Sequence, residues 1–147
     1  MEVRPYRSED LALMPPRGCE QSAAKLEEEL AFINVLRLAN PSFTLVANDG
    51  QPIAAAGIIV YRPGRGEGWL RGSTRMLEHP LKCARELRTR FKLIREEHKL
   101  WRVQATIRAE YDKGIWFARW LGFSAEGVLR KAGEDGQDMI MMAWVEE

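Results

Sequence analysis

The cysteine and histidine side chains, which could ligate a metal or act as nucleophiles, are few and widely separated in this chain. Cys19 and Cys83 lack metal-like spacing, and there is no further cysteine with which to build a disulfide framework. His79 and His98 lie 19 positions apart and are too isolated to be metal ligands. The sequence therefore predicts no metal site, and it predicts reduced thiols in a cytoplasmic protein.

Basic residues recur at helical spacing after His79-Pro80. This basic stripe consists of Lys82, Arg85, Arg88, Lys92 and Arg95. One hypothesis is that phosphates bind there: those of a cofactor at Lys82 and Arg85 only, which lie in the first turns, or those of a nucleic acid along the stripe. The other is that it is a solvated helix face, balanced by glutamates nearby. A formal net charge of +1 argues against a purely electrostatic nucleic-acid binder, so nucleic acid is the weakest of these partner classes.

The opposite face of the same helix, which includes Cys83, Ala84 and Leu87, is apolar, and we expect Cys83 to be a packing residue there.

The chain that must position these groups has 147 residues, of which 46% are hydrophobic and 29% charged, as in one soluble globular domain. Its first ten residues do not resemble a signal peptide, and its longest apolar run, residues 53–60, is too short to span a bilayer.

Hydrophobic periodicity and turn residues predict the order β-α-α-β-β-β-α-β-α-β-β. Helices are expected to start at Ser8, which would cap the first of them, at residue 20 and at His79. A fourth helix is expected to end at Gly122. Strands are expected at residues 2–6, 43–47, 53–60, 68–74, 103–107, 123–130 and 139–145, with Asp49-Gly50 turning between the second and third.

The most specific pattern lies at residues 116–123, Trp-Phe-Ala-Arg-Trp-Leu-Gly-Phe, followed by Glu126-Gly127-Val128. With the element order, it resembles the GCN5-related N-acetyltransferase (GNAT) superfamily, in which a helix ends in Leu-Gly-Phe. The stretches at residues 69–73 and 78–81 are similar to those of acetyltransferase-like proteins of tailed bacteriophages. The resemblance implies one GNAT-like domain over residues 1–147. Its α/β fold would have a mixed, mostly antiparallel central sheet, with splayed fourth and fifth strands flanked by helices.

The resemblance also implies where acetyl-coenzyme A would bind. The backbone of the fourth strand would pair with the pantetheine arm, and the pyrophosphate would lie at the start of the following helix, where free N–H groups favour anions. The residues at these positions are Trp69, Leu70, Arg71, Gly72, Ser73, Thr74, His79, Lys82, Cys83, Ala84 and Arg85.

The chain departs from the family in its phosphate loop. Of the loop's usual Gly and Ala residues, only Ala84 is present, so Lys82 and His79 would supply charge directly. Residues 65–68, Arg-Gly-Glu-Gly, look like the loop motif, but they lie too far from Leu-Gly-Phe, and we interpret them as a hairpin turn.

The second departure concerns the acid that protonates the thiolate. The family's tyrosine position holds Ala118, which leaves Tyr111 either as a substitute or as a solvated residue at a helix start. The base for the amine could be Glu67, Glu78 or water. The resemblance places acceptor specificity at residues 15–21 and at the turn of residues 133–136.

Two hypotheses remain for the function. The first is acetyl transfer from acetyl-coenzyme A to an amine of a protein or small molecule by a phage-encoded enzyme in the host cytoplasm. The second, motivated by both departures, is a catalytically weakened GNAT-fold module that binds a host protein or acts in the virion. Trp69, Trp116 and Trp120 are expected in the core, and Met139, Met141 and Met142 in strand packing or at an edge that joins a homodimer.

Overall fold

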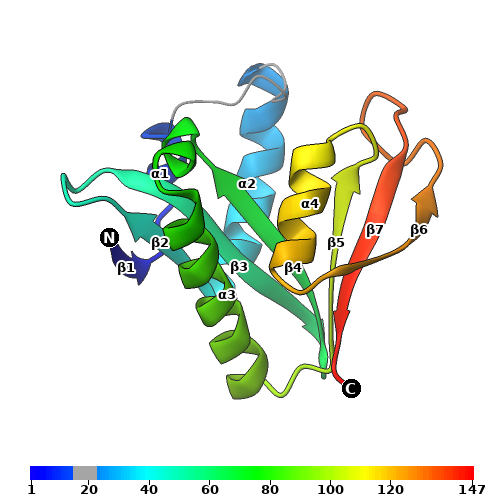
Figure 1. Ribbon diagram of the computed structural model, residues 1–147. Helices are drawn as coiled ribbons and strands as arrows, with labels where there is room; N and C mark the ends of the chain where they lie inside the picture. The colour runs from blue at the N-terminus through cyan, green and yellow to red at the C-terminus, as the bar shows by residue number, and fades with distance from the viewer. Residues whose placement is uncertain (15–22) are drawn as a thin grey trace. The chain divides into compact units, whose positions relative to one another are not determined.

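The computed structural model describes residues 1–14 and 23–147, with side chains of the second helix described from residue 31 onward. Its elements follow the predicted order (Figure 1). They are β1 (Glu2–Pro5), α1 (Glu9–Ala12), α2 (Ala23–Ala39), β2 (Ser42–Val46), β3 (Pro52–Arg62), β4 (Arg65–Gly72), the 3-10 helix η1 (Thr74–Glu78), α3 (Pro80–Glu97), β5 (Arg102–Arg108), α4 (Asp112–Trp120), β6 (Ser124–Leu129) and β7 (Met139–Val145). Three predictions fall on residues that the structure does not describe: the start of α2 at residue 20, Cys19 and the segment 15–21. The described part of α2 begins at Ala23.

The strands form one seven-stranded sheet in the order β1-β2-β3-β4-β5-β7-β6. The pairs β1–β2, β2–β3, β5–β7 and β6–β7 are antiparallel, and β4–β5 is parallel. The ladder between β4 and β5 joins Arg65–Glu67 to Arg102–Gln104, at the first residues of both strands. The prediction of a mixed, mostly antiparallel sheet with helices is therefore confirmed.

The chain divides into two compact units, and β4 contributes to both. Unit 1 comprises Met1–Ile59 and Trp69–Cys83. Its core is formed by the inward side chains of β2 and β3, among them Leu45, Ala54 and Ile58, which are fully buried. Small side chains in β3 let the backbone at Pro41 and Ser42 approach closely. The main-chain carbonyl of Pro41, for example, accepts a hydrogen bond from Ile58 beside Gly57.

Unit 2 comprises Val60–Gly68 and Ala84–Glu147. Leu87 of α3, Val103 of β5 and Met142 of β7 are its most deeply buried large side chains. The helix α4 ends as predicted, because Gly122 adopts a φ of 102°, in the region that favours glycine. Unit 2 therefore carries the strand–helix–strand segment that gave the sequence its most specific pattern.

Four local predictions were wrong. Ser8 makes no side-chain capping bond at α1. Residues 65–68 form the first half of β4 rather than a turn, because the turn is completed earlier, at Gly64 with a φ of 78°. The predicted fourth strand ends at Gly72, and η1 follows it. Trp116, expected in the core, is 63% exposed. The methionines of β7 do pack within the sheet, the first of the two alternatives expected for them, because β7 lies between β5 and β6.

Candidate functional site

The second half of β4 leads through η1 to the start of α3, and this segment holds most of the predicted donor-binding residues. Trp69, Leu70, Arg71 and Gly72 are partly buried on β4. Ser73 is fully buried; its amide and its hydroxyl both donate to the Ile53 carbonyl, at 3.0 and 2.7 Å. Because the Ser73 amide is already bonded, this residue anchors the segment rather than offering a donor.

Ser73 also starts η1. Its Oγ accepts a hydrogen bond from the Arg75 amide at 3.2 Å, so the hydroxyl caps the 3-10 helix in which Thr74 is exposed. This cap redirects the chain from strand to helix within unit 1. The switch from strand to 3-10 helix depends on one serine, which explains why a strand pattern alone did not locate it.

The first turn of α3 offers few main-chain donors. Pro80 has no N–H, and the Cys83 amide donates to the His79 carbonyl at 3.1 Å. Leu81 and Lys82 are therefore the helix residues whose amides remain for a partner outside the helix. The helix start can thus hold an anion with two amides, where a glycine-rich loop would offer more.

The side chains at this helix start point to two environments. Lys82 and Arg85 are exposed, as is His79. Cys83 and Ala84 are buried, and burial raises the pKa of the Cys83 thiol. The expectation that Cys83 is a packing residue is confirmed, and among these residues the charge available to a ligand comes from Lys82 and Arg85.

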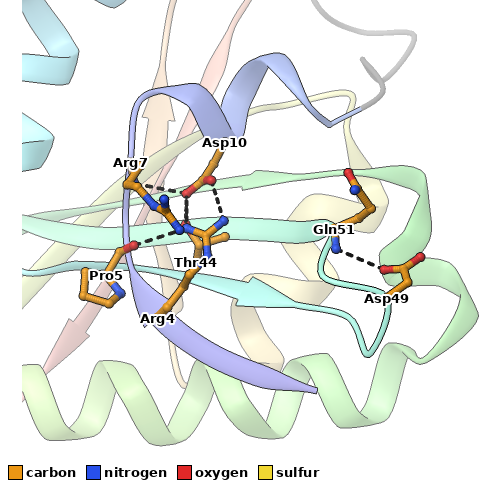
Figure 2. Close-up of polar contacts among 7 residues, drawn as sticks. All are labelled: Arg4, Pro5, Arg7, Asp10, Thr44, Asp49 and Gln51. Carbon is orange, nitrogen blue, oxygen red and sulfur yellow. Dashed lines mark hydrogen bonds and ion pairs between the residues drawn. The ribbon is translucent and has the colours of Figure 1, made fainter.

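Glu78, a predicted base, is exposed at the end of η1 with its Oε2 3.9 Å from Arg75 Nε. Arg75 pairs more closely with Asp49, at 3.1 Å. The Arg75 bond and the hydrogen bond from the Gln51 amide hold the pKa of Asp49 below its usual value. Figure 2 shows the second of these bonds. Glu78 is therefore the looser of the two partners of Arg75 and is open to solvent.

The other two predicted catalytic residues belong to unit 2. Glu67 is exposed on β4, opposite Gln104 in the parallel ladder. Tyr111 immediately precedes α4, and its ring lies so close to Gly114 that a Cβ there would be 2.4 Å from the Tyr111 Cδ1. Ala118, at the family's tyrosine position, is buried in α4.

A buried carboxylate that the sequence analysis missed lies in unit 1. Asp10 is 2% exposed and receives hydrogen bonds from Arg4, from the Thr44 hydroxyl and from the Arg7 amide (Figure 2). Burial alone would raise the pKa of Asp10, but these bonds outweigh it and hold the pKa below its usual value. The carboxylate joins β1, α1 and β2, so its role is structural.

A second missed group, the Arg37 cluster, consists of Tyr6, Asn34, Arg37 and Trp69. The Arg37 guanidinium carbon lies 4.0 Å from the centre of the Trp69 ring, and Tyr6 meets that ring edge-on at 5.1 Å between centroids. The Tyr6 hydroxyl donates to Asn34 Oδ1 at 2.7 Å. Burial lowers the pKa of Arg37 and raises that of Tyr6. A polar cluster thus lies beside the proposed donor strand.

Two further observations bear on the predictions. Over the part of the chain that the structure describes, no three His, Cys, Asp or Glu side chains are placed to hold a metal. None of the described helices is both long and apolar enough to cross a membrane.

The chain is similar to solved structures of N-acetyltransferases over nearly its whole length. Ard1 from Thermoplasma volcanium matches with a TM-score of 0.79 and 15% identity, covering 99% of this chain and 97% of that one. A spermidine N-acetyltransferase SpeG chimera, from Vibrio cholerae and hSSAT, matches with a TM-score of 0.75 and 15% identity over 98% and 94% of the chains. The ribosomal-protein-S5-alanine acetyltransferase from Vibrio fischeri gives 0.70 and 18% identity over 99% and 92%.

A scan against known protein families and a search of curated proteins find no match to the chain. At these identities the structural likeness establishes the GNAT fold, and the activity has to be argued from the site.

Proposed function

We propose that this protein transfers an acetyl group from acetyl-coenzyme A to an amine. The observation that carries the proposal is the continuous path from the β4 backbone, through the Ser73-capped η1, to the N-terminus of α3. The GNAT fold supports it, because the three solved structures named above that share this fold are described as acetyltransferases or as Ard1. A strand edge and a helix N-terminus suit the two parts of the donor, an amide-containing arm and a pyrophosphate.

The proposed donor site uses the backbone of Trp69, Leu70, Arg71 and Gly72 for the pantetheine arm. Thr74 follows on η1, and His79 and the amides of Leu81 and Lys82 would face the pyrophosphate. The exposed side chains of Lys82 and Arg85 add positive charge in the first turns of α3. Cys83 and Ala84 support the turn by packing, and Ser73 fixes where strand gives way to helix.

In the proposed reaction, the nitrogen of the neutral amine attacks the thioester carbonyl, the C–N bond forms and the C–S bond breaks. The amine's proton passes to a base, and the thiolate of coenzyme A is released or protonated. The candidate bases are Glu78 in unit 1, Glu67 in unit 2 and water. The candidate acid is Tyr111 in unit 2. Because transfer is direct, holding the two reactants in position can supply much of the rate.

Calorimetric titration with acetyl-coenzyme A tests the proposal. We expect binding, and we expect Lys82→Glu to weaken it about tenfold or more, because a like charge replaces a charge-assisted contact to phosphate. Lys92→Glu is the matched control, since Lys92 is exposed on the same helix but lies well beyond its first turn. An unchanged affinity in Lys82→Glu would place the phosphates elsewhere. The absence of both heat and thermal stabilisation at millimolar donor would remove the enzyme hypothesis.

A second candidate function is a protein-interaction module, and the described part of α2 favours it. Phe32, Val35 and Leu38 expose 70%, 65% and 53% of their surfaces on that helix. The phage-like stretches at residues 69–73 and 78–81 suggest a host protein as the partner or as the amine acceptor. Affinity capture from a host lysate should then recover a stoichiometric partner without acetyl-coenzyme A, and Phe32→Ser should abolish that recovery.

A further inference from the structure

The described part of α2 exposes three large apolar side chains and buries a charged one. Phe32, Val35 and Leu38 face solvent, whereas Ile33 and Leu36 are half-buried and Arg37 is only 9% exposed. The main chain of Arg37 is fixed, because its carbonyl accepts a hydrogen bond from Ser42 Oγ at 2.9 Å. The fold therefore holds a guanidinium inside unit 1 at a position that an apolar side chain would ordinarily fill.

The guanidinium of Arg37 lacks an anion among the described residues. Among the described residues, its enclosed Nε and Nη1 have no hydrogen-bond partner, and neither has the nearby Trp69 Nε1. The neighbours that act on its charge are the Tyr6 hydroxyl and a second cation, Arg71, and burial together with Arg71 lowers the pKa of Arg37. The Tyr6 hydroxyl forms a hydrogen bond with the Arg37 side chain. Enclosed donors without a partner, such as Nε and Nη1, are nevertheless rare in folded proteins, because each loses its hydration without replacement.

Three other arginines show the usual arrangement, although Arg65 and Arg90 each also have an enclosed Nε without a hydrogen-bond partner among the described residues. Arg4 is paired with Asp10 at 2.7 Å, Arg75 with Asp49 at 3.1 Å and Arg102 with Glu126 at 2.7 Å. These three are less enclosed than Arg37, yet each has a carboxylate. Arg37 is thus more buried than these three arginines, yet it has no carboxylate partner among the described residues.

We propose that Arg37, stacked on Trp69 and flanked by Tyr6, binds a carboxylate of the acceptor amine. The proposal rests on the proposed function, because the bound amine is an acetyl acceptor only if the protein transfers acetyl groups. A guanidinium on an aromatic face is weakly hydrated and presents a planar fork that matches a carboxylate. The cluster is closed by Tyr6 but only partly buried at Asn34, Trp69 and Arg71, which gives a ligand a side from which to approach.

The acceptor, rather than the donor, fits this position. The phosphates of the donor are proposed at Lys82, on the first turn of α3 and thirteen residues beyond Trp69. The backbone of Trp69 belongs to the strand proposed for the pantetheine arm, while its side chain packs on Tyr6 and Arg37. One residue therefore lies against both the proposed donor strand and the carboxylate subsite, which would bring the amine of a carboxylate-bearing acceptor towards the thioester.

Amines that differ in one carboxylate test the proposal. The first arm compares lysine with cadaverine and tyrosine with tyramine, and the second compares the amidated dipeptides Ser-Glu and Ser-Gln, so that a free amino acid and an acidic peptide are distinguished. We expect the carboxylate-bearing member of at least one pair to be acetylated with about 10- to 100-fold higher kcat/KM. Arg37→Met should abolish that preference, and Arg37→Lys should retain part of it. Arg88→Met, at an exposed position of α3, should leave it unchanged.

Thermal unfolding and donor titration separate this proposal from the proposed function. Lysine or the Ser-Glu dipeptide should raise the unfolding temperature of the wild type without acetyl-coenzyme A, even if no acetyl transfer occurs, and should not raise that of Arg37→Met. Equal use and equal stabilisation by both members of every pair would overturn the proposal. Weakened donor binding in Arg37→Met would also overturn it, because that result would assign Arg37 to the donor phosphates. If Arg37→Met does not fold, Arg37→Lys decides: an unchanged preference, or none, contradicts a fork-specific contact.

Discussion

Asp10 shows at the scale of one residue what a buried charge requires in this fold. Its carboxylate is enclosed, but it accepts bonds from a guanidinium, a hydroxyl and a main-chain amide (Figure 2). These three groups come from β1, from the turn between β1 and α1, and from β2, so one side chain fastens the beginning of the chain to the sheet. Removing its charge would leave Arg4 without a partner.

We expect Asp10→Asn to lower the free energy of unfolding by about 3 kcal/mol, the usual cost of breaking a buried ion pair. The same variant should lose part of the acid sensitivity of the wild type. The pKa of Asp10 is depressed in the folded state, so its contribution is present above the unfolded-state value of about 4 and is lost as the pH falls through the folded-state value.

Urea unfolding at pH 7 and at a series of lower pH values measures both effects. Asp49→Asn is the control, because Asp49 pairs with Arg75 at an exposed site and should change the midpoint little. An Asp10→Asn protein as stable as the wild type, with the same slope of stability against pH, would show that the Arg4–Asp10 pair contributes nothing net.

At the scale of the elements, local patterns were enough wherever one face of an element is apolar. The boundaries of β7 were predicted to the residue, and Gly122 correctly ended α4. Patterns failed where a polar side chain makes a long-range contact. No local signal indicates that Asp10 is buried against Thr44, 34 positions away, or that Arg37 turns inward while Phe32 turns outward. The proposed donor site follows from the family resemblance and stays a prediction. The Arg37 cluster could not be predicted, because its members come from the segment after β1, from α2 and from β4.

The close packing of β3 gives a prediction at this scale. A Cβ at Gly57 would lie 2.4 Å from the Pro41 carbonyl oxygen and 2.9 Å from the Ser42 Cα, both of them backbone atoms that cannot rotate away. We expect Gly57→Ala to destabilise the protein by about 2 kcal/mol, since overpacked sites typically lose 1–3 kcal/mol. Thermal or urea unfolding provides the measurement.

Gly127→Ala is the matched strand control, because nothing lies within 4 Å of a Cβ at that position of β6. If both variants were equally stable, the approach of the Pro41 carbonyl to β3 would be looser than the structure has it. The comparison also bears on Arg37, because the hydrogen bond that fixes its carbonyl comes from Ser42, the residue that a Cβ at Gly57 would displace.

For the whole molecule, the position of the proposed donor site determines which amides a bound donor should protect from hydrogen exchange. All of its main-chain groups, from Trp69 to Lys82, belong to unit 1, whereas β6 belongs to unit 2 and forms the last strand of the sheet, with all its residues exposed. A ligand that binds the native state protects the amides it contacts most strongly, and adds a smaller, uniform protection through global stabilisation.

We therefore expect acetyl-coenzyme A to slow hydrogen exchange most in peptides that cover residues 69–83, and above all at the amides of Leu81 and Lys82, which have no acceptor within the helix. Peptides that cover β6 serve as the internal control and should slow only slightly. The measurement is exchange followed by mass spectrometry with and without saturating donor, repeated on Lys82→Glu, in which the difference should shrink. Protection confined to β6 and β7, in a protein that binds the donor by calorimetry, would move the site out of unit 1 and with it the proximity of the Arg37 cluster to the thioester.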